Sequence, residues 1–83
     1  MGQGEKRLEH MRSNPKGGWT IDDVRVVCDA FGIALRPPSG GSHFKVSHES
    51  QRDILTIPYG RPLKPIYIRR LVEFVDAVKD RAT

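Results

Sequence analysis

The chain has 83 residues, a single cysteine and a formal net charge of +4 at pH 7. This length predicts one small domain over residues 1–83, and the lone Cys28 excludes an intrachain disulfide. With no apolar run near the roughly 20 residues of a membrane span and no secretory signal, we expect a cytoplasmic protein without a membrane partner.

The chain is predicted to begin with a short helix over residues 5–12. Leu8 and Met11 are its only apolar contacts. The Asn-Pro-Lys-Gly-Gly segment at 14–18 ends it, since proline lacks an N–H donor and glycine favours turns. This segment separates the first helix from the rest of the chain.

A second helix opens the core, which we place at residues 19–80. Thr20 is a good N-cap, and Gly32 is typical of the position that follows a helix. Apolar residues recur between them at three- and four-residue intervals, which predicts one buried face. Cys28 lies on that face, so we interpret it as a core residue rather than a nucleophile. The face consists of Ile21, Val24, Cys28 and Phe31.

Three short strands are predicted next, over residues 33–36, 43–47 and 53–58. The prolines at 37–38 end the first strand because they cannot continue the pairing. The segment 48–52 has a length that suits an antiparallel hairpin between the last two strands.

The second strand alternates between apolar and polar residues. Side chains in a strand point to opposite faces with period two. If Phe44 and Val46 face the core, His43 and Lys45 face outward together, and Arg36 joins them on the neighbouring strand.

The last helix begins at Pro65, which suits a first helical turn. Its apolar stripe consists of Tyr67, Ile68, Leu71, Val72, Phe74, Val75 and Val78. The predicted fold class is thus α+β, in the order α-α-β-β-β-α, with a three-stranded antiparallel sheet that helices cover on one face.

Basic residues gather in the middle of the chain. Between positions 36 and 70 only Glu49 and Asp53 are acidic, whereas the rest of the chain carries a net charge of −1. Such an asymmetric stretch favours phosphate binding, although a solvated face that aids solubility has the same composition. The basic residues are Arg36, Lys45, Arg52, Arg61, Lys64, Arg69 and Arg70.

His43 is the candidate catalytic residue, because histidine titrates near neutral pH and can move protons on a polyanion. Gly40 and Gly41 allow another backbone to approach the strand end, and the Ser42 hydroxyl can bind a phosphate oxygen. An ordinary hairpin loop would look similar. Arg61 and Lys64 belong to a second cationic loop. The histidines and Cys28 are too scattered for a metal site, and we expect no cofactor.

Four stretches carry a resemblance to a known family. In this order and spacing the chain resembles the HicA-type toxins, the mRNA-cleaving partners in bacterial type II toxin–antitoxin pairs. The stretches are Ala30–Arg36, Gly41–Phe44, Leu55–Pro58 and Leu63–Pro65. The resemblance implies a fold like the double-stranded-RNA-binding domain, ribosome-independent mRNA cleavage with His43 as the catalytic histidine, and a HicB-type antitoxin that covers His43. Many members carry a second histidine where Phe44 stands here. Longer members have a further helix at the start, so the resemblance implies that residues 1–14 are an N-terminal helical extension.

The resulting hypothesis is a metal-independent ribonuclease. His43 would act as general acid or base, while Arg36, Ser42, Lys45, Arg61 and Lys64 hold the RNA. A non-catalytic RNA-binding module of the same fold is the alternative. A third possibility is an interaction domain whose basic face docks an acidic protein.

Overall fold

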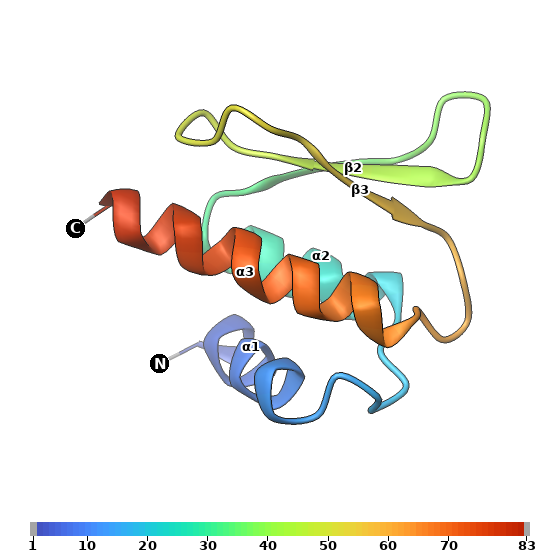
Figure 1. The fold of residues 1–83 in the computed structure, drawn as a ribbon, viewed down its shortest axis with the longest axis horizontal. Helices are drawn as coiled ribbons and strands as arrows, with labels where there is room; N and C mark the ends of the chain where they lie inside the picture. The colour runs from blue at the N-terminus through green and yellow to red at the C-terminus, as the bar shows by residue number, and fades with distance from the viewer. Residues whose placement is uncertain (1, 83) are drawn as a thin grey trace.

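The structure, a computed structural model, describes residues 2–82 and confirms the predicted α+β class and element order (Figure 1). Three helices and three strands follow one another in the order α-α-β-β-β-α. The elements are α1 (Gln3–Ser13), α2 (Ile21–Ala30), β1 (Ala34–Arg36), β2 (His43–Ser47), β3 (Leu55–Pro58) and α3 (Pro65–Ala82).

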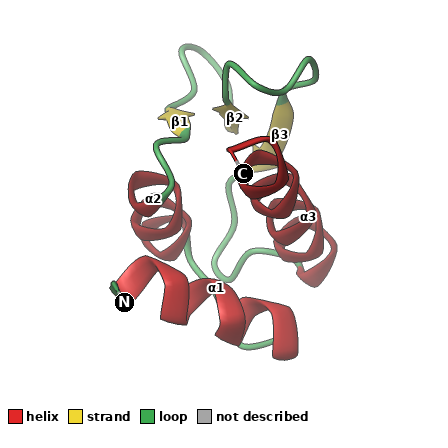
Figure 2. Ribbon diagram, turned by 90° about the vertical axis from the view of Figure 1, so that its left-hand side faces the viewer, coloured by secondary structure: helices red, strands yellow, loops and turns green. Residues whose placement is uncertain are grey.

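The elements form three layers (Figure 2). The strands pair antiparallel in the order β1-β2-β3 and make the first layer. Helices α2 and α3 cover one face of this sheet, and α1 packs against both of them on the side away from the sheet. No element in the part of the chain that the structure describes covers the other face of the sheet.

The core lies between the sheet and the helices, with a second part beneath α1. The central residues of each predicted helical stripe are buried in this core. Phe31, Tyr67 and Phe74 are half-buried at the margins of the core. Fully buried side chains include Leu8, Met11, Val24, Val27, Cys28, Val46, Ile57, Ile68, Leu71 and Val75.

Both ends of α2 are closed by local hydrogen bonds. The Asp23 carboxylate accepts from the backbone N–H of Thr20 at 2.9 Å and from its hydroxyl at 3.1 Å. Gly32 has a φ of +66°, a conformation that side chains disfavour. Because the chain turns there, the N–H of Ile33 donates to the carbonyl of Cys28 at 2.9 Å. The predicted cap and stop of this helix are confirmed.

The second strand has its predicted bounds, but the other two are shorter than expected. Ile33 lies outside β1 because its N–H closes the end of α2 instead of pairing in the sheet. Asp53 and Ile54 lie outside β3, since Leu55 opposite Val46 is the last pair of the β2–β3 register. Ile54 is consequently 58% exposed.

Helix α1 is held by apolar packing and by two ion pairs. Its two predicted apolar contacts, Leu8 and Met11, are buried. The Arg12 guanidinium makes two hydrogen bonds, at 2.7 and 2.8 Å, with the Asp76 carboxylate of α3. Arg7 lies 3.5 Å from Asp23 at the start of α2. The extension is thus an integral third layer of the domain.

Cys28 is buried, and burial raises the pKa of its thiol to about 12. A thiol in this setting is protonated at neutral pH and is a poor nucleophile. Its interpretation as a core residue is confirmed. Over residues 2–82, no helix combines the length and the hydrophobicity that crossing a membrane requires.

Candidate nucleic-acid interface

The uncovered face of the sheet is the candidate interface, and we call it the open face. It is defined by the outward residues of the three strands. Along β2, Phe44 and Val46 are buried against the helices, whereas His43 and Lys45 are exposed. The alternation therefore places the imidazole and the ammonium group on the same side, as predicted. The open face consists of Ala34, Arg36, His43, Lys45, Ser47, Thr56 and Pro58.

The strand register brings a second cation to this site. Arg36 of β1 is the direct partner of Lys45, and both are exposed. Directly opposite residues in an antiparallel pair have their Cβ atoms about 4.5–5.5 Å apart. His43 lies two residues from Lys45, with Pro58 as its own partner on β3. One imidazole and two cations thus share one end of the open face.

A hollow of about 470 Å³ lies at this end. The chain between β1 and β2 forms its wall, and the residues that line it include no carboxylate. A Cβ atom added at Gly40 or Gly41 would meet nothing within 4 Å, so the wall is open to an approaching molecule. The lining residues are Arg36, Pro37, Pro38, Ser39, Gly40, Gly41, His43 and Lys45.

Ser42 precedes β2 and is exposed, but it does not line this hollow. Its carbonyl accepts a hydrogen bond of 2.7 Å from the N–H of Tyr59, which extends the β2–β3 pairing by one position. Its backbone therefore fixes the strand end on which His43 stands.

The two predicted loop cations lie apart from the His43 hollow. Arg61 lines a different hollow of about 350 Å³, together with Thr20 and Ile21 at the start of α2. Its Nε donates to the Tyr59 hydroxyl at 2.9 Å. Lys64 directly precedes α3 and is exposed. The structure therefore brings Arg36, His43 and Lys45 together, whereas Arg61 and Lys64 form a separate cationic loop.

The sequence reasoning missed Thr56. This residue is the direct partner of Lys45 on β3, is exposed, and presents a hydroxyl on the open face. The sequence pattern places it only within the third predicted strand. The apolar Ile57 beside it is the sequence signal for this, because alternation turns the neighbour of a core residue outward.

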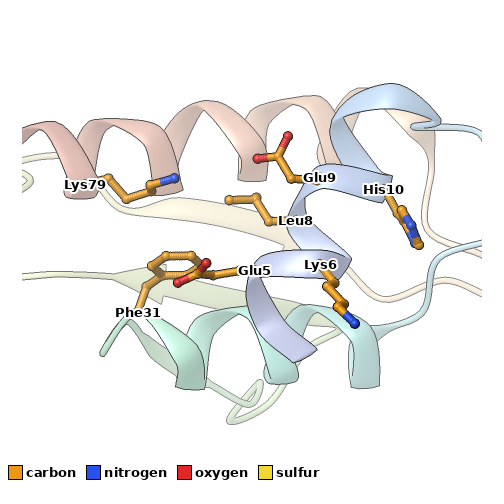
Figure 3. A pocket seen from close by; sticks show the side chains of 7 residues that line it. All are labelled: Glu5, Lys6, Leu8, Glu9, His10, Phe31 and Lys79. Atoms are coloured by element: carbon orange, nitrogen blue, oxygen red, sulfur yellow. The ribbon is translucent and has the colours of Figure 1, made fainter. Parts of the chain in front are cut away.

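A further hollow, of about 280 Å³, lies among the three helices (Figure 3). Leu8 and Phe31 contribute apolar surface to it, and the Lys79 ammonium lies 5.6 Å from the centre of the Phe31 ring. Glu5 and Glu9 of α1 line the same hollow. It lies on the helical side of the molecule and contains no residue of the open face.

Within residues 2–82, no three histidine, cysteine or carboxylate side chains gather closely enough to hold a metal ion. No protein-family model, curated protein or solved structure matches the chain.

Proposed function

We propose that the protein is a ribonuclease that cleaves mRNA at the open face without a metal ion, and that it acts as the toxin of a HicA-type toxin–antitoxin pair. One observation supports this most strongly. The register of β1 on β2 places two cations beside an exposed histidine, in a hollow without carboxylates. Such a surface favours a phosphate diester and offers it a group that can transfer protons.

In the proposed reaction, the 2′-oxygen of a nucleotide attacks the adjacent phosphorus. The bond from phosphorus to the 5′-oxygen breaks, leaving a 2′,3′-cyclic phosphate and a 5′-hydroxyl. The 2′-hydroxyl loses one proton and the leaving oxygen gains one, and His43 carries out one of these transfers. Arg36 and Lys45 stabilise the negative charge that develops on the phosphoryl oxygens.

The cationic loop with Arg61 and Lys64 would hold a more distant part of the RNA. Phosphate contacts of this kind add affinity without adding sequence information. The family resemblance further suggests an acidic, HicB-type antitoxin that covers His43. A small acidic protein with a DNA-binding segment, encoded beside this chain, would support this partner.

The central experiment compares His43→Ala with the wild type on a defined transcript. We expect the cleavage rate to fall by about 10²–10⁴-fold, the usual contribution of a well-placed acid or base. His10→Ala is the matched control, because His10 is also exposed but lies on α1. Growth arrest on expression should follow the same pattern, while circular dichroism shows an intact fold.

The products and a chelator test the chemistry. We expect 2′,3′-cyclic phosphate ends, unchanged rates with a chelator present, and no cleavage where the 2′-hydroxyl is replaced by hydrogen. A purified protein that binds RNA but leaves it intact would support the alternative, a non-catalytic RNA-binding module. Rates that collapse with the chelator would instead indicate a metal-dependent nuclease.

A further inference from the structure

None of the six phenylalanine, tyrosine and tryptophan side chains of the chain lies on the open face. Phe44 faces the core from within β2, and Tyr59 follows the outward Pro58 and therefore turns to the opposite side. The rings of these two residues lie 6.0 Å apart. The other four, Trp19, Phe31, Tyr67 and Phe74, pack against the core from the helices and their flanks.

This absence limits how the face can hold RNA. Proteins that bind single strands stack bases on aromatic rings, and they recognise base edges with arginine, lysine, carboxamide, carboxylate or hydroxyl groups. The outward positions here carry cations, hydroxyls, a histidine, a proline and an alanine, and no carboxamide or carboxylate. Arg36 and Lys45 are the cations that could read a base edge, and the proposed reaction commits both to the phosphate. The hydroxyl of Thr56, opposite Lys45 on β3, then remains for a sugar hydroxyl.

The proposed reaction adds a second limit. Attack needs the 2′-oxygen in line with the leaving 5′-oxygen, and rates depend steeply on such alignment. A paired A-form strand holds its 2′-oxygen off that line, and pulling a nucleotide out of a stack costs a few kcal/mol. Enzymes that do so hold the extruded base against aromatic or apolar side chains. Among the outward strand residues the only aromatic ring is the His43 imidazole, which the proposed reaction uses for proton transfer.

We infer that the open face takes unpaired, flexible RNA and grips its sugar–phosphate backbone rather than its bases. This inference rests on the proposed ribonuclease function and names the substrate class within it. The flexibility that the reaction requires is supplied by the RNA, and the protein supplies charge and the imidazole. Cleavage should therefore follow RNA secondary structure and be nearly indifferent to sequence.

The test is a transcript that joins a long perfect stem to a long loop containing every dinucleotide step. We expect cuts throughout the loop, with rates that differ by less than about fivefold, the lower limit for one specific base contact. Annealing a complementary strand to the loop should abolish them. Cuts in the stem, or a preference for one step well above that limit, would overturn the inference.

The two proposals fail in different ways. Stem cutting or base-specific cutting that His43→Ala abolishes would refute the inference and leave the ribonuclease standing. A preparation that cuts no RNA, or whose cutting is unchanged in His43→Ala, would refute the ribonuclease and the inference with it.

A variant with an added aromatic side chain tests, by RNA affinity alone, whether the open face lacks a stacking surface. Ala34 is exposed on the open face, two residues from Arg36, so Ala34→Tyr adds the missing stacking surface. In a His43→Ala background we expect this change to tighten binding of a single-stranded oligonucleotide by about 5- to 100-fold. Ser13→Tyr, at the exposed end of α1, is the control and should change nothing. An unaltered affinity for Ala34→Tyr would show that RNA does not lie on this face.

Discussion

Arg36 lies directly opposite Lys45 in the pairing of β1 with β2, so two like charges occupy neighbouring positions on the open face. Like charges in this arrangement oppose folding by roughly 0.2–1 kcal/mol, as much as one favourable cross-strand pair contributes. The pair suits the proposed site for a phosphate diester, since a bound anion would relieve the repulsion.

The first prediction separates these two effects. Lys45→Thr should raise the free energy of unfolding by roughly 0.2–1 kcal/mol, because it removes the repulsion and keeps a strand-forming residue. The same change should weaken RNA binding. It should also reduce by about 0.7 the steepness with which the logarithm of the binding constant falls with the logarithm of the salt concentration. Urea denaturation and binding titrations measure the two. Arg52→Thr removes an equal charge from the exposed β2–β3 loop, and matching effects in both variants would contradict the prediction.

Arg36 and Arg61 should differ in their kinetic effects. Arg36 shares the hollow with His43, so Arg36→Ala should lower the cleavage rate at saturating RNA by about 10²-fold. Arg61 is held on the helical side by Tyr59. Arg61→Ala should therefore raise KM, the RNA concentration that gives half the maximal rate, and leave kcat unchanged. Steady-state kinetics separate kcat from KM. A fall in kcat for Arg61→Ala would show that its loop reaches the reacting phosphate.

Gly4 tests the docking of α1. A Cβ atom here would overlap the Cβ of Ala30 and lie 3.1 Å from the carbonyl oxygen of Val26. Alanine gains up to about 1 kcal/mol in helix propensity, but overpacking costs typically 1–3 kcal/mol. We expect Gly4→Ala to lower the free energy of unfolding in urea. Gly2→Ala, where a Cβ meets nothing within 4 Å, is the control. Equal free energies of unfolding for the two variants would contradict the close packing of Gly4 against Ala30.

The Arg12–Asp76 pair predicts how stability depends on acid. The hydrogen bonds from Arg12 hold the pKa of Asp76 below its usual value. The pair therefore stabilises the fold above the unfolded pKa of Asp76, and this contribution is lost as the pH falls through the folded pKa. Because both side chains are over one-third exposed, we expect at most about 1 kcal/mol.

Asp76→Asn measures that contribution. At neutral pH the variant should be slightly less stable than the wild type, and the difference should vanish in strong acid. Free energies of unfolding in urea, compared across the acidic range, test this. A difference that is the same at every pH would assign the loss to packing instead of charge.

The fold followed from the sequence wherever a local pattern determines it. Strict alternation gave β2 its bounds, and Thr20 and Gly32 closed α2 where expected. The predictions failed where one backbone group has two possible partners. Ile33 looks like a strand residue, yet its N–H completes the turn after α2. The close approach of Gly4 to Ala30 depends on how two helices pack, and no pattern within either helix reveals it.

The candidate site was partly predictable for the same reason. Period two put His43 and Lys45 on one face, but only the register shows that Arg36 stands opposite Lys45. Register is set by the chain between strands and by core packing, which the sequence does not display directly. The position of Arg61 depends on the path of a loop, so charge alone could not separate it from the His43 hollow.

The long axis of the molecule bears on how the protein can be handled. In Figure 1, α3 ends at the left extremity and α1 begins on the left half of the molecule, whereas the loop that leads into β2 lies at the right extremity. A fluorophore, an affinity handle or a surface tether joined at either terminus would thus be remote from the imidazole. Immobilised or dye-coupled protein should retain the behaviour of the unlabelled molecule towards nucleic acid.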